Sequence, residues 1–212
     1  MRPRQLGDLT LPRKDIERLQ WMIDNDAILN LLFYGQWGIG KTSAARVFKG
    51  NDKYGSIEKS GPNLRKRDDI DKHITGFAMS MSLLSDKRKL CFIDDAERMP
   101  KAVQAVLSKV VEDTSANCRF IMTANDKTKL IPALGTRLIE ICFDVAPADR
   151  AEVIERLRAR YAKALHEMDV AFDDQRLAEI VGIWFPDMRA IANHIEYEFL
   201  QCAVQVEERK AQ

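Results

Sequence analysis

The stretch from Gly35 to Thr42 has the residue types that a loop needs to wrap a triphosphate. It runs Gly-Gln-Trp-Gly-Ile-Gly-Lys-Thr and satisfies the pattern G-x-x-x-x-G-K-[ST]. Glycines have no Cβ, so successive backbone N–H groups can turn inward around the phosphate oxygens. The ammonium of Lys41 can reach the outer phosphates, and the hydroxyl of Thr42 can ligate Mg²⁺. The alternative is a glycine-rich turn without a ligand.

The segments on either side of this turn favour a ligand. Residues 28–34 are a mostly apolar run, which predicts a buried strand. Residues 43–48 then open a helix, whose N-terminus carries partial positive charge towards bound phosphates. The sequence therefore predicts a nucleotide site between a strand and a helix.

Polar side chains also stand at the ends of two later strands. Asp94 and Asp95 follow the apolar run at residues 89–93, and an acid there suits Mg²⁺ coordination opposite a phosphate loop. Asp94 is our candidate for the metal shell, and Asp95 could orient or deprotonate an attacking water. Asn125 ends the strand predicted at residues 119–124 and could position the γ-phosphate or that water. Since turns favour Asp and Asn, a plain turn is the alternative in each case.

Two arginines could complete such a site. Arg137 lies between two predicted strands, from where it can reach a phosphate on a neighbouring subunit and neutralise charge that develops in phosphoryl transfer. Arg189, near the start of the last predicted helix, could close onto the phosphates. Either arginine alone is more often a surface residue. The ordered set Gly-Lys-Thr, Asp-Asp, Asn, Arg, Arg is much more specific than any one member.

The elements that must position these residues form an α/β pattern followed by a helical one. Strands are predicted at 28–34, 89–93, 119–124 and 138–143. Helices are predicted at 15–24, 43–48, 69–84 with an interruption near Gly76, 100–113, 148–167, 174–183 and 187–209. No element is assigned to residues 50–63.

This layout predicts an α/β fold in which helices sandwich a parallel sheet, with a small three-helix domain after it. We place the first domain at residues 1–146 and the helical domain at residues 147–212. Ligands of parallel sheets bind at the carboxyl ends of the strands, where Gly35, Asp94 and Asn125 fall.

The composition is that of a soluble globular protein, with 46% hydrophobic and 31% charged residues. No apolar run approaches the roughly 20 residues that span a membrane, and no signal peptide is visible. We therefore expect a cytoplasmic protein without a membrane partner, in the host cytoplasm if the chain is phage-encoded. The net charge of +1 does not by itself indicate nucleic acid. The scattered cysteines predict buried free thiols rather than a metal site: Cys91, Cys118, Cys142 and Cys202.

The whole series resembles an AAA+ ATPase, and within that superfamily the clamp-loader ATPase subunits of replication factor C and of T-even-type phages. Residues 92–120 match without gaps the stretch hhDEADxMtxxAQxALRRxMExxsxxxRF of these subunits. Residues 121–137 resemble their sensor-1 strand and IIPALxSR segment, and residues 185–189 resemble their sensor-2 motif. Residues 2–3 and 8–12 resemble the N-terminal segment that packs beside adenine.

The resemblance implies a set of binding residues for ATP. The phosphates would be held by a run of six residues: Gly38, Ile39, Gly40, Lys41, Thr42 and Ser43. Thr10 would contribute to the adenine pocket, and Arg189 would be the sensor-2 arginine. Mg²⁺ would be organised by Asp94 together with Thr42.

The resemblance also implies catalytic roles. Lys41 and Asn125, as sensor 1, would act on the outer phosphates, and Asp95 would take the place of the catalytic acid. Arg137 would act in trans as an arginine finger, so that hydrolysis needs an assembled ring. Glu112 matches a glutamate at the subunit interface. Gln104 matches the residue that couples the ATP sites to the DNA-facing centre.

The function implied is the ATP-dependent loading of a sliding clamp onto primer–template DNA, together with other clamp-loader subunits. The chain departs from the pattern at Asp95, where the family has the longer Glu, and at Ser108, where it has the first of two arginines. These subunits carry a third, collar domain, and we expect none in this chain. The collar is then on another chain, or the chain is a reduced form, or assembly uses the ATPase tier alone. The alternatives are another AAA+ protein, such as a helicase loader, and an ATP-binding scaffold subunit with weak hydrolysis.

Overall fold

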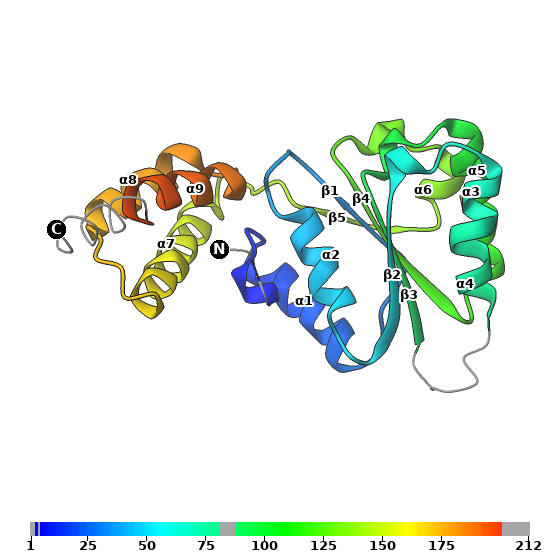
Figure 1. Ribbon diagram of the computed structural model, residues 1–212, viewed down its shortest axis with the longest axis horizontal. Coiled ribbons are helices and arrows are strands. Elements are labelled where there is room, and N and C mark those ends of the chain that lie inside the picture. Colours follow the sequence, from blue (N-terminus) through cyan, green and yellow to red (C-terminus); the bar gives the residue numbers. More distant parts are fainter. Residues whose placement is uncertain (1–2, 4, 81–87, 201–212) are drawn as a thin grey trace, which may run out of the picture.

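A five-stranded parallel sheet forms the centre of the larger part of the molecule (Figure 1). The computed structural model of this chain describes residues 3, 5–80 and 88–200. The strands lie in the order β2-β3-β4-β1-β5, and every neighbouring pair is parallel. Their bounds are β1 Leu31–Tyr34, β2 Tyr54–Ser60, β3 Arg88–Asp94, β4 Cys118–Ala124 and β5 Ile139–Cys142. The predicted parallel α/β architecture is thus confirmed.

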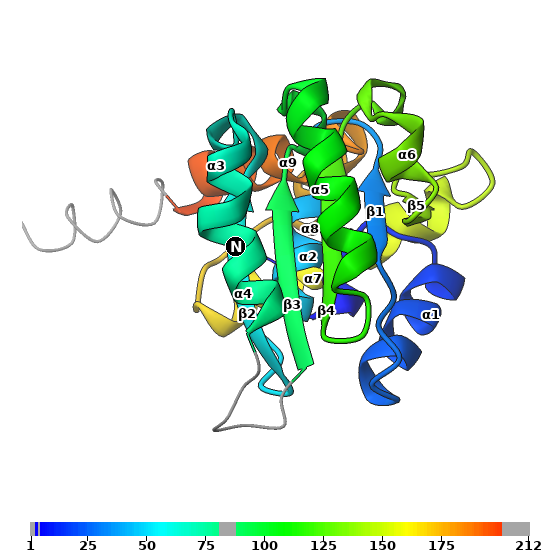
Figure 2. The same cartoon turned by 90° about the vertical axis from the view of Figure 1, so that its right-hand side faces the viewer.

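Helices cover both faces of the sheet. Helices α1 and α2 lie on one face, and α3, α4, α5 and α6 lie on the other (Figures 1 and 2). Their bounds are α1 Arg13–Asp24, α2 Lys41–Lys49, α3 Arg67–Ile70, α4 Gly76–Met79, α5 Lys101–Asp113 and α6 Pro132–Gly135. The sheet is therefore the middle layer of three.

Two apolar cores lie between these layers because successive residues of a strand point to opposite faces. In β1, Leu31 and Phe33 pack against α1 and α2, whereas Leu32 packs into the core beneath α3, α4 and α5. Strand β3 alternates in the same way. Burial on both faces explains why the central strands are continuous apolar runs in the sequence.

Strand β2 is the strand that the sequence pattern misses. It pairs with β3 over its whole length, from Tyr54 opposite Arg88 to Ser60 opposite Asp94. Most of its residues are only half-buried, since β2 lies at the edge of the sheet. An edge strand with one partner needs no apolar run, so its sequence Tyr-Gly-Ser-Ile-Glu-Lys-Ser gives little periodicity.

The helix predicted at residues 69–84 begins two residues earlier than expected. A π-helical turn over Asp71–Thr75 joins α3 to α4, directly before Gly76, where the interruption is predicted. The part of this prediction at residues 81–84 lies outside the described residues.

The cysteine prediction is correct for two residues and wrong for one. Cys91 and Cys118 are buried free thiols, and burial raises the pKa of Cys118 to about 12. Cys142 is exposed, because it belongs to the edge strand β5 and points away from the core. Cys202 lies outside the described residues.

The described residues beyond Pro147 are helical and have a separate core. Helices α7 Arg150–Glu167, α8 Asp174–Trp184 and α9 Met188–Ile195 pack around buried apolar side chains, and a π-helical turn Glu196–Leu200 follows α9. The predicted last helix extends further, over residues 201–209, which lie outside the described part. We propose that the boundary between two domains lies between residues 146 and 147. None of the described helices combines the length and apolar character that crossing a bilayer requires.

Candidate nucleotide site

The predicted phosphate loop connects β1 to α2 at the carboxyl end of the sheet. Three of its residues have positive φ angles, Gly35 at 140°, Gly38 at 75° and Gly40 at 102°, which favour glycine. A Cβ at Gly35 would lie 2.8 Å from Oδ1 of Asp144. That same carboxylate oxygen accepts a hydrogen bond from the backbone N–H of Gln36 at 2.8 Å. Asp144, just after β5, therefore holds the start of the loop.

The loop is also in contact with the start of α9. The N–H of Met188 donates to the carbonyl of Gly38 at 3.0 Å. The carboxylate of Asp187 caps the helix, with Oδ1 accepting from the N–H groups of Arg189 at 2.9 Å and Ala190 at 3.0 Å. The helical part thus touches the loop through one backbone hydrogen bond and through the capping carboxylate of Asp187.

A methyl group at Gly38 should disturb this contact. Its Cβ would lie 2.0 Å from Oδ1 of Asp187, on a residue with positive φ. We expect Gly38→Ala to weaken ATP binding by about tenfold or more, since a strained loop costs of order 1–3 kcal/mol. Calorimetric titration with ATP measures this. Gly182→Ala is the matched control, because a Cβ there meets nothing within 4 Å; unchanged binding in both variants would contradict the prediction.

Lys41 is buried, and its ammonium donates all three of its hydrogen bonds to the loop and to Asn125, the residue after β4. Nζ donates to the carbonyls of Gly35 and Gln36, both at 2.7 Å, and to Oδ1 of Asn125 at 2.9 Å. Burial lowers the pKa of Lys41, and the nearby carboxylates, led by Glu97, oppose that shift. The structure thus brings Lys41 and Asn125 together, as a common site requires.

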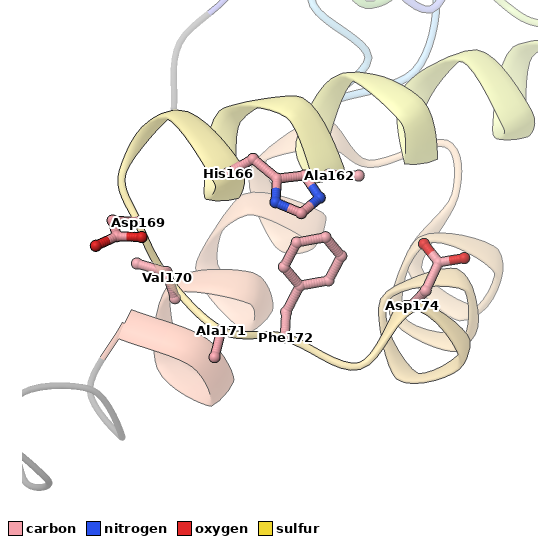
Figure 3. A pocket seen from close by; sticks show the side chains of 7 residues that line it. All are labelled: Ala162, His166, Asp169, Val170, Ala171, Phe172 and Asp174. Carbon is pink, nitrogen blue, oxygen red and sulfur yellow. The ribbon is translucent and has the colours of Figure 1, made fainter.

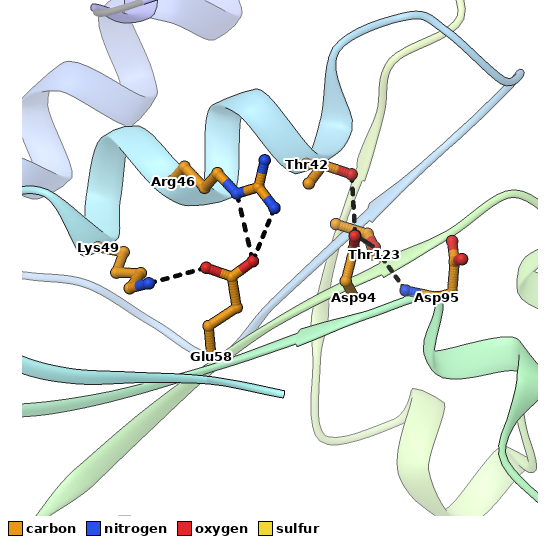
Figure 4. A network of polar contacts seen from close by, with 7 residues as sticks. All are labelled: Thr42, Arg46, Lys49, Glu58, Asp94, Asp95 and Thr123. Carbon is orange, nitrogen blue, oxygen red and sulfur yellow. Dashed lines mark hydrogen bonds and ion pairs between the residues drawn. The ribbon is translucent and has the colours of Figure 1, made fainter. Parts of the chain in front are cut away.

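Thr42, Asp94 and Asp95 are joined by a hydrogen-bonded chain through Thr123 (Figure 4). The hydroxyls of Thr42 and Thr123 donate to Oδ1 of Asp94 at 2.8 and 2.6 Å. The N–H of Asp95 donates to the Thr123 hydroxyl at 2.9 Å. Thr42 and Asp94 offer the oxygen atoms that Mg²⁺ prefers. In the described part of the chain, no group of three or more His, Cys, Asp or Glu is placed so that it could hold a metal ion.

Asp95 lies on a left-handed turn with φ 54° at the end of β3. Burial is the main cause that raises the pKa of its carboxyl, followed by the charges of Asp94 and Glu97. The backbone of Asp95 is approached closely by Gly61, the residue after β2, since a Cβ there would lie 2.3 Å from the Asp95 carbonyl oxygen. The segment that follows the unpredicted edge strand therefore packs against the backbone of this acid.

Glu97 is a residue of the site to which the sequence pattern gives no role. Its Oε1 accepts hydrogen bonds from Asn125 twice, from the backbone N–H at 3.0 Å and from Nδ2 at 2.8 Å. The one available signal is its place as the last acid of the stretch that matches DEAD. A pattern match does not say which neighbour an acid contacts.

Thr10 is fully buried beneath the loop. Its hydroxyl donates to the carbonyl of Ile39 at 2.5 Å. Arg156 of α7 donates to the carbonyls of Leu9 and Leu11 on either side. The N-terminal segment thus lies between α7 and the loop; the predicted adenine pocket at Thr10 stays a prediction.

Ser43 and Arg189 are at the margins of this group. Ser43 is half-buried in the first turn of α2, next to Thr42. Arg189 is exposed, but its neighbour Met188 reaches the loop, since a Cβ at Gly40 would lie 3.0 Å from the Met188 sulfur. The backbone of Arg189 therefore lies next to the phosphate loop, while the residue as a whole is exposed.

Arg137 is separated from the other predicted site residues. It precedes β5, whose Ile139 pairs with Leu31 at the start of β1. The phosphate loop follows the other end of β1, roughly 10 Å further along at about 3.3 Å per residue. Arg137 donates to Oε2 of Glu112 and to the carbonyl of Ala133. It borders a pocket of about 380 Å³ lined by Asn30, Val111, Glu112, Ser115, Thr136 and Arg137.

Helix α5 is tied to the segment that carries Arg137. The buried Gln104 donates through Nε2 to the carbonyls of Met99 at 3.0 Å and Lys129 at 3.3 Å, and its Oε1 accepts from the N–H of Ile131 at 2.8 Å. The Ser108 hydroxyl donates to a carbonyl of the same segment, at Ala133, at 2.8 Å. Gln104 therefore connects the segment after β4 with α5, and the coupling role predicted for it stays a prediction.

A second hollow lies at the far end of the helical part (Figure 3). It has about 510 Å³ and is lined by Ala162, His166, Asp169, Val170, Ala171, Phe172 and Asp174. The His166 ring packs edge-on against Phe172 at 5.0 Å between centroids. None of the predicted site residues lines it.

Comparison with known proteins identifies the family of the chain. The profile described as "ATPase family associated with various cellular activities (AAA)" matches residues 31–145, more than half of the chain. Replication factor C subunit 3 of Oryza sativa subsp. japonica is 30% identical over 204 residues, which cover 92% of this chain and 55% of the relative. The replication factor C small subunit of Methanoculleus marisnigri is 31% identical over 200 residues, covering 92% and 60%. The chain thus spans a little over half the length of these relatives.

Solved structures agree on the fold. The Thermotoga maritima RuvB Holliday junction branch migration motor superposes with a TM-score of 0.61 over 92% of this chain and 72% of that one, at 18% identity. At this identity the likeness concerns the fold alone. Together, the matching profile, the sheet order and the loop that joins β1 to α2 show that the chain belongs to the AAA family of ATPases.

Proposed function

We propose that this chain is an ATPase subunit of a clamp loader, which uses ATP to place a sliding clamp on primer–template DNA. The observation that carries the proposal is a site in two halves. Lys41, Thr42, Asp94 and Asn125 converge at one end of the sheet, and Arg137 lies at the other. In an assembly of such chains, Arg137 of one subunit would reach the nucleotide of its neighbour. The nucleotide in its own site would meet the arginine of another subunit. The similarity to replication factor C subunits supports an assembly with other clamp-loader subunits.

The residues around the loop would share the work of binding ATP. Residues 38–43 would hold the phosphates with backbone N–H groups and with Lys41, helped by the positive end of α2. Thr10 would lie beside the adenine, and Arg189 would reach in from the start of α9. Mg²⁺, held by Thr42 and Asp94, would neutralise charge on the phosphates.

Hydrolysis would depend on placing a water and on stabilising charge. Asp95 would accept the proton of that water, and its raised pKa makes it a stronger base than an ordinary aspartate. Asn125 would orient the water or the γ-phosphate. Arg137 would supply positive charge in trans, so that turnover requires neighbouring subunits.

Turnover in the assembled complex tests this function. The complex captured with this chain in ATP is weighed by native mass spectrometry, and its ATP hydrolysis is then measured with and without a clamp and primed DNA. We expect clamp and primed DNA together to raise the rate by about tenfold or more. A rate that no clamp and no primed DNA changes would refute clamp loading. ATP binding without turnover in any assembly would favour a scaffold subunit.

A further inference from the structure

The amide of Asn125 has only one orientation that satisfies both of its neighbours. Lys41 can only donate hydrogen bonds, and an ionised Glu97 can only accept them. The Asn125 oxygen must therefore face Lys41 Nζ, at 2.9 Å, and its Nδ2 must face Glu97 Oε1, at 2.8 Å. The amide is fixed between a cation and an anion.

Binding of ATP would remove one of these two constraints. In the proposed function, Lys41 turns from the loop carbonyls to the phosphates, and Asn125 loses its donor. Glu97 then remains as the neighbour that decides which end of the amide faces the site. Because Oε1 also accepts from the Asn125 backbone N–H at 3.0 Å, Glu97 is anchored independently of the amide that it orients.

Only one of the two carboxylate oxygens of Glu97 is hydrogen-bonded by the described residues. Oε2 is buried and has no hydrogen-bond partner among the described residues. A buried carboxylate oxygen without a partner costs free energy. Proteins keep such locally unfavourable groups mainly at functional sites.

We propose that Glu97 is a positioning residue, which keeps the Asn125 amide turned with its oxygen towards the γ-phosphate side of the site. Resting on the proposed ATP hydrolysis, this inference makes Asn125 a hydrogen-bond acceptor for the attacking water. A flipped amide would present its two N–H donors to that water instead. It could not accept a hydrogen bond from the water and so could not orient it for attack.

The test compares two replacements of Glu97 in the assembled complex. Glu97→Met keeps the length but removes the acceptor, and we expect kcat to fall by about tenfold to hundredfold, since small misplacements of a catalytic group have this effect. Glu97→Gln keeps an acceptor oxygen, and we expect it to stay within about fivefold of the wild-type rate. The affinity for ATP and the melting temperature should change little in both. Glu179→Met, an exposed glutamate on α8, is the matched control and should have the wild-type rate.

A double variant shows whether Glu97 acts through Asn125. In an Asn125→Ala background, Glu97→Met should cause no further loss, because the amide that it orients is gone. An additional tenfold loss there, or a Glu97→Gln protein as slow as Glu97→Met, would overturn the proposal and indicate a direct role of the charge.

A spectroscopic measurement keeps the inference testable without turnover. In ¹H–¹⁵N spectra of the wild-type chain with a non-hydrolysable ATP analogue and Mg²⁺, the Nδ2 proton of Asn125 that points to Glu97 should exchange slowly with solvent. Slow exchange should persist in Glu97→Gln and be lost in Glu97→Met. Rapid exchange of this proton in the wild type would overturn the positioning role. Absence of stimulation by clamp and DNA would refute clamp loading while leaving this result valid.

Discussion

Replacing Lys41 with alanine should weaken ATP binding by at least about 100-fold. The ammonium is held beside the loop by three hydrogen bonds of 2.7 to 2.9 Å, to Gly35, Gln36 and Asn125, from where it would turn to the phosphates. A hydrogen bond to a charged group contributes about 1.5–3 kcal/mol, and loss of about 2.8 kcal/mol corresponds to 100-fold in affinity. Calorimetric titration of the purified chain with ATP and Mg²⁺ gives the dissociation constant.

The control for Lys41 is a lysine of the same helix that lies away from the loop. Lys49 ends α2 and pairs with Glu58 at 2.8 Å, a carboxylate that Arg46 also binds (Figure 4). Lys49→Ala removes the same charge, and we expect its ATP affinity to stay within about twofold of wild type. If Lys41→Ala binds ATP as tightly as Lys49→Ala, the loop is not the phosphate site.

Replacing Arg137 with alanine should leave ATP binding intact and remove most turnover, in the assembled complex only. Its side chain lies beside Glu112 at the amino ends of the strands, far from its own phosphate loop. An arginine that stabilises phosphoryl transfer contributes about 10³ to 10⁵ in kcat, so we expect at least about a 1000-fold loss. Single-turnover hydrolysis by the complex, alongside ATP titration of the isolated chain, separates the two effects.

Arg176→Ala serves as the comparison for this second prediction. Arg176 is an exposed arginine of α8 that pairs with Glu179 and Glu198, so its replacement also breaks surface ion pairs. We expect the complex that carries it to hydrolyse ATP at the wild-type rate. An Arg137→Ala complex with that same rate would show that Arg137 does not act in trans.

The sequence predicts the parts of the fold that depend on local patterns. The central strands are apolar runs because both of their faces are buried, and the phosphate loop shows in its glycines and Lys41. The failures are one edge strand, β2, which is not predicted, and one residue of the other edge strand, β5, whose predicted location at residues 138–143 is confirmed. The half-exposed β2 has no apolar run, and Cys142 in β5 faces solvent although its segment looks like a core strand.

The site could be predicted as a set of residues but not as a set of contacts. Lys41 and Asn125 are 84 positions apart, and they meet because β4 lies beside β1, an order that no local pattern contains. The same holds for Asp187, which reaches Gly38 from the last helix, and for Glu97 beneath Asn125. Motif matches supply the candidate members of a site, and strand order supplies their partners.

The position of β1 in the sheet also determines when the molecule can first bind a nucleotide during its synthesis. Leu31 pairs with Ile121 on one side and Ile139 on the other, so its partners leave the ribosome 90 (121 − 31) and 108 (139 − 31) residues later. At about 5–20 residues per second this takes roughly 5 to 20 seconds. Until then the loop at residues 35–40 has no neighbouring strands to hold it. A nascent chain should therefore acquire ATP only after β5 has emerged.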